Sequence, residues 1–294
     1  MKYFETYKEV KELKLFNVRG HLRNIALSGL SVIDRVKSYE KELRRPRVQF
    51  LYVHHVFKDE EQKFDLLLKK LSADHTFISY FNAVEKVLKR EIDKPYITIS
   101  SDDGFKNNIK VAEILNRYAA KACFSINPSI IEENNYERIK RYCKEKLNFP
   151  PVEFLNWKEI EQLQKMAHEI GSHTMNHINV AETPVEVLKA DIEKSYEILK
   201  TKCGDVKHFA FPYGKFFHFS EAGRKTVFNT GFISCATAER GCHINHDRAL
   251  SRNELCILRD HLILDWDINH ILHFIINNSR KASINNNLFP YSKQ

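Results

Sequence analysis

The sequence has 294 residues, of which 43% are hydrophobic and 12% aromatic, enough to bury the core of one large domain or two small ones. The 46 Lys and Arg residues nearly balance the 38 Asp and Glu residues, so the formal net charge of +8 excludes a strongly basic or acidic tail-like protein. The chain has only 9 glycines, whereas average usage of roughly 7% predicts about 20. This scarcity argues against glycine-rich linkers, collagen-like repeats and folds built from many hairpins.

No stretch of the sequence approaches the roughly 18 uninterrupted apolar residues that a membrane span requires. Residues 1–16 interleave acidic, basic and apolar side chains and lack the continuous apolar run of a secretory signal. We therefore expect a cytoplasmic protein with at most peripheral membrane contact. The six cysteines form no C-x-x-C pair, and in that reducing compartment we expect them to be free thiols.

Most of the net positive charge lies in residues 1–47, which contain 12 Lys and Arg against 6 Asp and Glu. Apolar residues at helical spacing, such as Leu27, Leu30 and Ile33, predict two or three short amphipathic helices there. This basic helical extension could pack on the main domain as a solvated appendage. Alternatively, it could contact an anionic membrane or a phosphate-linked substrate. We expect no nucleic-acid binding, because the segment lacks interleaved exposed aromatic residues and any recognised module.

From Val48 onward, predicted strands alternate with predicted helices. The strands are expected at residues 48–56, 75–79, 96–100, 121–126, 169–173, 208–214 and 232–237. The helices are expected at residues 63–71, 81–92, 107–118, 157–169, 184–204 and 221–231. A charged segment at residues 132–156 looks inserted, and residues 278–294 are expected to form a polar C-terminal tail. This alternation predicts an α/β fold in which residues 48–277 form a closed or nearly closed β/α barrel.

Two adjacent carboxylates, Asp102 and Asp103, follow the strand predicted at residues 96–100. The active site of a β/α barrel lies at the carboxyl ends of its strands. A turn or helix cap is the competing interpretation, because Asp and Gly dominate turns. Stability alone explains the pair poorly, since adjacent carboxylates repel one another unless a cation or an arginine offsets their charge.

Two imidazoles, His173 and His177, lie at the end of the strand predicted at residues 169–173. A spacing of four puts both side chains on one face of a helical turn, where both nitrogens could reach one metal at about 2 Å. Asp103 could supply a third ligand and leave one position open for water, and such open three-ligand sites are catalytic. The competing interpretation is two ordinary, partly exposed histidines.

A third group, F-A-F-P-Y-G at residues 209–214, ends another predicted strand. Rings around its Pro-Tyr-Gly turn could form the wall of a groove, and a backbone N–H of the turn could stabilise an oxyanion. The simpler interpretation of this segment alone is a buried strand that ends in a turn.

In this order the three groups resemble the motifs of the polysaccharide deacetylase family, the carbohydrate esterase family 4-like proteins with a NodB homology domain. I-S-S-D-D-G resembles the family's T-F-D-D-G motif, S-H-T-M-N-H contains its H-[ST]-x-x-H motif, and F-A-F-P-Y-G is similar to a variant of its third motif. The likeness covers residues 48–260, and the combination is far more specific than any one motif. It implies a distorted β/α barrel of the NodB type and a metal-dependent hydrolase.

The resemblance also implies roles for individual residues. The ligands of a divalent metal, most naturally Zn²⁺, would be Asp103, His173 and His177. Asp102 would be the general base that takes a proton from the attacking water. The Tyr213 N–H, in the turn that begins at Pro212, would face the oxyanion.

Two departures from the family pattern concern the groups around the base. The common third motif has an arginine that orients the base, but this sequence has Ala210 there, and we expect Arg252 to replace it. The family's late L-x-H motif, which supplies the general acid, has no clear match in this sequence. The run L-Y-V-H-H-V resembles the first strand of members with a permuted motif order, which favours His54 as the general acid. His55 is one alternative, because a slip of one residue reverses the face of a strand. His261 is the other, because it precedes the segment L-I-L-D-W, which loosely resembles the family's late motif.

The resulting hypothesis is removal of an N-acetyl group from a polysaccharide, oligosaccharide or lipid-linked sugar in cell-envelope glycan metabolism. An O-acetyl esterase or a deformylase would need the same site with a different pocket. A non-catalytic glycan-binding module is a further alternative. The retention of Asp102 speaks against it, because a binding module needs no base.

Overall fold

The computed structural model describes residues 2–13, 39–282 and 289. Within these residues nine strands, all parallel, form one sheet in the order β8-β7-β6-β5-β4-β3-β1-β9, with β2 also paired to β3. The strands are β1 (Arg47–Val53), β2 (Thr76–Phe77), β3 (Pro95–Ser101), β4 (Ala122–Ile126), β5 (Glu169–Ser172), β6 (His208–Ala210), β7 (Ser234–Ala236), β8 (Cys256–Ile257) and β9 (Arg259–His261). Strand β1 is buried along its whole length, as expected of a parallel strand covered on both faces.

One short segment, residues 256–261, brings the two ends of the sheet together. Its first part, β8, pairs with β7, and its second part, β9, pairs with β1. Only Leu258 separates the two strands, so the sheet curls into a nearly closed barrel. The predicted NodB-type β/α barrel is therefore confirmed.

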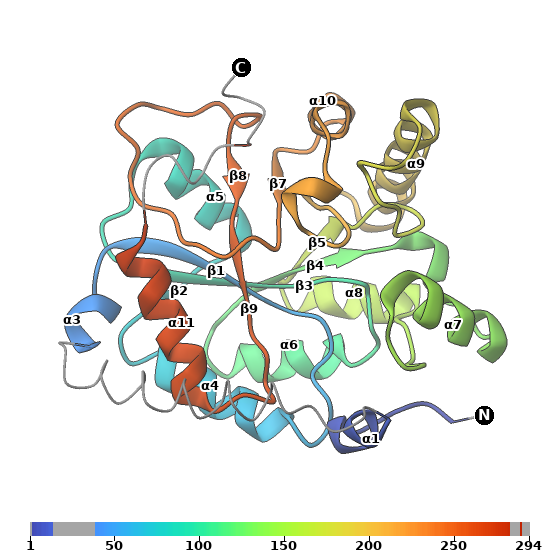
Figure 1. The fold of residues 1–294 in the computed structure, drawn as a ribbon, viewed down its shortest axis with the longest axis horizontal. Helices are drawn as coiled ribbons and strands as arrows, with labels where there is room; N and C mark the ends of the chain where they lie inside the picture. The colour runs from blue at the N-terminus through green and yellow to red at the C-terminus, as the bar shows by residue number, and fades with distance from the viewer. Residues whose placement is uncertain (1, 14–38, 283–288, 290–294) are drawn as a thin grey trace.

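Helices surround the strands, with α4, α6 and α11 below the sheet and α5, α9 and α10 above it in Figure 1. The α-helices are α1 (Tyr7–Glu12), α3 (Tyr39–Leu43), α4 (Glu61–Leu71), α5 (Tyr80–Lys89), α6 (Asn108–Asn116), α7 (Tyr136–Tyr142), α8 (Trp157–Lys165), α9 (Val185–Cys203), α10 (Glu221–Thr230) and α11 (Ile268–Arg280). Three shorter helical turns are η1 (Pro128–Ile130), η2 (Cys143–Leu147) and η3 (Phe216–His218). Their sequences explain their bounds: α8, for example, starts at a reciprocal capping box between Asn156 and Glu159. No helix of the described residues is both long and apolar enough to cross a membrane.

The sequence-based boundaries fail mainly where turns begin. The strand predicted at residues 208–214 ends at Ala210, because the following Phe-Pro-Tyr-Gly forms a turn. Strands β8 and β9, together with α11, were not predicted. Within the predicted polar tail, Phe289 is fully buried and its ring stacks on that of Phe219, with 5.5 Å between centroids.

The described part of the N-terminal extension does not stand apart from the barrel. Helix α1 packs on the loop after β1, where Asp59 accepts hydrogen bonds from the backbone N–H groups of Tyr7 and Lys8 at 2.7 and 3.1 Å. Val10 on its inner face is buried. Most of the predicted amphipathic helices fall in residues 14–38, outside the described residues. The proposed contact of the extension with an anionic partner therefore stays a prediction.

A buried histidine at the barrel closure gives a test based on pH. His243 is fully buried, accepts a hydrogen bond from the Leu258 N–H through Nε2 at 3.1 Å, and pairs with the backbone of Val48. Burial lowers the pKa of His243 to about 3, whereas an unfolded histidine titrates near 6.5. Between these values only the unfolded chain gains the proton, so this group lowers the free energy of unfolding by about 1.4 kcal/mol per pH unit as the pH falls.

We expect His243→Gln, which keeps an acceptor but does not titrate, to be less stable than the wild type at pH 7.5. Its disadvantage should shrink steadily below pH 6.5. Urea denaturation of both proteins between pH 5 and 7.5 measures the difference. A difference that does not change with pH would show that His243 is not held neutral in the fold.

Candidate active site

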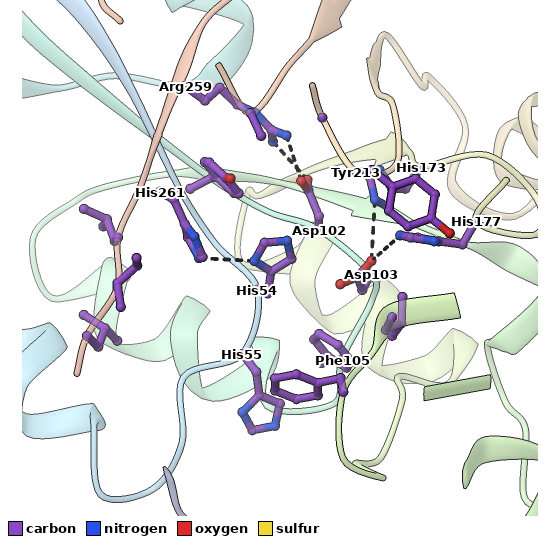
Figure 2. A pocket seen from close by; sticks show the side chains of 18 of the residues that line it. His54, His55, Asp102, Asp103, Phe105, His173, His177, Tyr213, Arg259 and His261 are labelled. Carbon is purple, nitrogen blue, oxygen red and sulfur yellow. Dashed lines mark hydrogen bonds and ion pairs between the residues drawn. The ribbon is translucent and has the colours of Figure 1, made fainter. Parts of the chain in front are cut away.

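A cavity of about 400 Å³ opens at the carboxyl ends of the strands (Figure 2). Its walls include the residues that directly follow β1, β3, β5 and β6, namely His54, Asp102, His173 and Phe211. The three motifs are far apart in the sequence, and the parallel strands deliver them to the same end of the barrel. This placement is the one that the sequence predicts.

Asp103, His173 and His177 form a buried cluster whose ligand atoms all lie within 4.8 Å of one another. The Nε2 atoms of both imidazoles lie 3.5 Å from Oδ1 of Asp103. His173 is held in this orientation because its Nδ1 lies 2.7 Å from the Ala210 carbonyl oxygen. The prediction of a helical turn is wrong, because residues 173–177 form a bent loop. Thr174 and His177 have positive φ angles of 66° and 50°, and this loop brings the two rings together.

The chemistry of these three residues fits a divalent cation. Oδ1 of Asp103 is buried and has no hydrogen-bond donor among the described residues, although two imidazole nitrogens converge on it. Burial, and then the charge of Asp102, raise the pKa of Asp103 well above its usual range, and burial lowers the pKa of both histidines. Neutral imidazoles beside a carboxylate that is costly to ionise fit a possible metal site better than a set of ion pairs.

Asp102, next to this cluster, is held as a carboxylate by Arg259. The guanidinium makes a two-pronged contact, with Nη1 3.0 Å from Oδ1 and Nη2 2.8 Å from Oδ2. Burial alone would raise the pKa of Asp102, but the Arg259 charge and hydrogen bonds bring it well below the usual range. Arg259 is itself fixed, because its Nε donates to the Thr237 carbonyl and its guanidinium lies 4.4 Å from the centroid of the Tyr52 ring.

The structure therefore corrects the expectation that Arg252 orients Asp102. Arg252 lies in an exposed turn before β8 and pairs with Glu85 on α5 at 3.3 Å, away from the cavity. Arg259 takes the position beside Asp102 that was expected of Arg252. It is the first residue of β9, which pairs with β1, and its guanidinium reaches Ser100 at the end of β3. A signal for it was present: an arginine, an aspartate and a histidine interrupt the otherwise apolar run at residues 255–264.

The Pro212-Tyr213-Gly214 turn forms another wall of the cavity. Tyr213 has φ 63° and its ring lies against His177, with 4.9 Å between centroids. Gly214 has φ 66° and a Cβ there would lie 2.3 Å from the Cβ of Ala238, so only glycine fits. The glycine carbonyl accepts a hydrogen bond from the Ala238 N–H at 2.7 Å, which fixes the turn beside the cluster.

The two histidines at the end of β1 point to different places. His54 faces the catalytic groups, where its Nδ1 lies 3.3 Å from Nε2 of His261 (Figure 2). His55 points away from them into a group of aromatic rings, 4.2 Å from the centroid of Phe57 and 5.4 Å from that of Phe105. His54 and His261 thus lie together on one side of the cavity, whereas His55 does not reach that side.

These features define a β/α barrel of the NodB type, with its polar site at the carboxyl ends of the strands. Residues 89–230 match the sequence profile of the family described as polysaccharide deacetylase. This match confirms the resemblance predicted from the motifs. No curated relative shows significant sequence similarity to the chain.

Solved structures of deacetylases share the fold. The Streptococcus pyogenes deacetylase PplD, determined in complex with acetate, aligns with a TM-score of 0.60 at 16% identity, covering 79% of this chain and 97% of that one. IcaB from Ammonifex degensii aligns with a TM-score of 0.61 at 14% identity, over 80% and 97% of the two chains. A de-N-acetylase from Aggregatibacter actinomycetemcomitans aligns with 0.61 at 16% identity, over 78% and 99%. At these identities the likeness is one of fold.

Proposed function

We propose that this protein is a metal-dependent hydrolase that removes an N-acetyl group from a carbohydrate. The observation that carries the proposal is the convergence of an Asp-His-His cluster and a second carboxylate, held ionised by Arg259, in one cavity at the strand ends. A structural metal site has no use for the second carboxylate. A hydrolase needs it as a base.

Asp103, His173 and His177 would hold the metal, and two imidazoles with one carboxylate favour Zn²⁺. When bound, such a metal polarises a carbonyl oxygen and makes a water molecule more acidic. The hydrogen bond between Nδ1 of His173 and the Ala210 carbonyl fixes which ring nitrogen faces the metal position.

The protein side chains then move the protons. Asp102 accepts a proton as the water oxygen bonds to the acetamide carbon, and Arg259 keeps that carboxylate charged and oriented. The Tyr213 N–H faces the oxygen on which negative charge develops. His54, in its imidazolium form, donates a proton to the nitrogen as the carbon–nitrogen bond breaks, so that a neutral amine and acetic acid, which ionises to acetate, leave. The proton taken up by Asp102 then recharges His54.

The substrate we propose is an N-acetylated glycan of the cell envelope, as a polymer, an oligosaccharide or a lipid-linked sugar. Two supporting observations are the family match and the structural neighbours themselves, one a deacetylase solved with acetate and one a de-N-acetylase. An O-acetyl esterase would use the same groups, so the choice of acetyl linkage is part of the test.

Metal analysis and acetate release from N-acetylated oligosaccharides test the proposal in wild type, His173→Ala and Asp102→Asn. We expect about one metal ion in the wild type and loss of both metal and activity in His173→Ala. Asp102→Asn should retain the metal but lose about 10²–10⁴-fold in turnover, because the proton acceptor is gone.

Well-folded wild-type protein that binds no divalent metal would contradict this function. Faster release from an O-acetylated sugar than from its N-acetylated counterpart would identify the esterase instead. His218→Ala is a matched control for His173→Ala, since His218 lies near the rim in η3 but outside the ligand cluster.

A further inference from the structure

Beyond the catalytic groups, the cavity continues into a second compartment lined by aromatic rings. We define the aromatic recess by Tyr7, Phe57 and Phe149, which all line the cavity. The Phe57 ring centroid lies 5.8 Å from that of Tyr7 and 6.0 Å from that of Phe149, so the three rings form one surface. Figure 2 shows that this direction, marked by His55 and Phe105, leads away from His261 and from the cluster at Asp103.

The N-terminal segment forms one wall of the aromatic recess. Residues 2–13 contact three separate parts of the chain. The Phe4 N–H donates a hydrogen bond to the Pro151 carbonyl in the inserted segment at 3.0 Å, and the Glu5 carbonyl accepts one from the Lys58 N–H at 3.1 Å. The Lys11 side chain forms an ion pair with Asp265. With the inserted segment, and with Phe57 and Phe105 from the loops after β1 and β3, they build a small hydrophobic cluster distinct from the main core of the barrel. Tyr7 is thus held against the cavity by contacts on either side of it.

A buried carboxylate lies beside the rings of the recess. Glu60 is 8% exposed, lines the cavity, and accepts one hydrogen bond, from the Phe57 N–H at 3.2 Å. No Lys or Arg of the described residues forms an ion pair with it. Burial raises the pKa of Glu60 to about 7, so the site holds a carboxyl group that gains from any hydrogen-bonding ligand.

We propose that the aromatic recess binds a second sugar ring of the glycan, the ring next to the one that carries the scissile acetamide. The apolar face of this ring packs on Tyr7 and Phe149, and one of its hydroxyl groups hydrogen-bonds to Glu60. This subsite rests on the proposed function, because the same glycan supplies both rings. Tyr7, Phe149 and Glu60 are then residues that determine specificity.

The mixture of groups in the recess favours a sugar ring over a hydrocarbon chain. A hydrocarbon chain would bury the Glu60 carboxyl group completely without offering it a hydrogen-bond partner. Burying an unpaired polar group costs free energy. A pyranose presents C–H groups to aromatic faces and hydroxyl groups at its edge, so it satisfies both the rings and the carboxyl group. Lys146 and Asp265 also line the cavity and extend the set of polar partners at its rim.

Binding to full-length protein whose turnover is strongly reduced tests the subsite separately from catalysis. In the Asp102→Asn background with Zn²⁺ added, calorimetry would compare N-acetylglucosamine with N,N′-diacetylchitobiose. We expect the disaccharide to bind at least about tenfold more tightly, a gain typical of one stacked ring with one hydrogen bond. Tyr7→Ala and Glu60→Gln should each remove most of this preference, whereas Tyr7→Phe should retain it.

Lys8→Ala is the matched control for Tyr7→Ala, because Lys8 is the exposed neighbour on α1. Equal affinities for the two sugars, no measurable binding of either, or a preference that survives both Tyr7→Ala and Glu60→Gln would overturn the subsite. Tighter binding of N-hexanoylglucosamine than of the disaccharide would overturn it in favour of a hydrocarbon. The subsite and the proposed function can be told apart. If the disaccharide binds more tightly only when Tyr7 is present, but the wild type releases no acetate, the subsite is supported and the proposed function is refuted.

Discussion

Replacing Arg259 with methionine is expected to lower the free energy of unfolding by about 3–5 kcal/mol, because it leaves the Asp102 carboxylate buried without its partner. Arg259 is 1% exposed and Asp102 is 2% exposed, so water cannot take over the lost contacts. The same change should reduce acetate release at least about 100-fold, since the base loses both its orientation and the charge that keeps it ionised. Urea denaturation and acetate release measure the two effects on the same protein.

Arg252→Met is the matched control, with the same chemical change at the arginine that the sequence favours. Its guanidinium is about half exposed and pairs with Glu85 at the surface, where an ion pair contributes roughly 0–1 kcal/mol. We expect no measurable change in turnover. Equal losses of activity in the two variants would contradict the assignment of Arg259.

A double variant separates the buried charge from the lost packing. Arg259→Met combined with Asp102→Leu removes both charges of this pair, so it should be more stable than Arg259→Met alone although it is inactive. Stability equal to or lower than that of the single variant would mean that the packing of Arg259 on Tyr52 matters more than the ion pair.

The placement of the three motifs could be predicted from the sequence because each is local and follows a strand with a clear pattern. Asp102 and Asp103 follow β3, and His173 follows β5, so the barrel itself brings them together. The detail within a motif was less predictable. The spacing of His173 and His177 suggested a helical turn, but the ring positions come from left-handed backbone at Thr174 and His177.

The groups that complete the site come from segments without a clear pattern. Strands β8 and β9 have two and three residues, too few for any periodicity, yet they close the barrel and carry Arg259 and His261. Tyr7 belongs to a six-residue helix whose position depends on hydrogen bonds to Asp59, about 50 residues away in the sequence. Charge counting placed this segment outside the catalytic domain, whereas tertiary contacts make part of it a wall of the cavity.

His54→Gln is expected to reduce acetate release from an N-acetylated sugar by about 10²–10⁴-fold while the metal stays bound, because the amine would have to leave without a proton. His261→Gln should have a smaller effect, since His261 contacts His54 at 3.3 Å and stacks on Tyr52, and so acts by positioning the acid. His55→Gln should lower turnover less than about tenfold, because its ring lies among the aromatic side chains. Acetate release and metal content measured for all three variants test this order.

The leaving group distinguishes an acid from a group that only supports the fold. 4-Nitrophenyl acetate releases a phenolate that needs no proton, so His54→Gln should affect its hydrolysis far less than that of an N-acetylated sugar. Asp102→Asn should slow both substrates by similar factors, because the attacking water must lose a proton in either reaction. If His54→Gln slows both substrates equally while His261→Gln spares the ester, the acid is His261. The buried pair would then transfer its proton from β9 rather than from β1, although both strands deliver their histidines to the same side of the cavity.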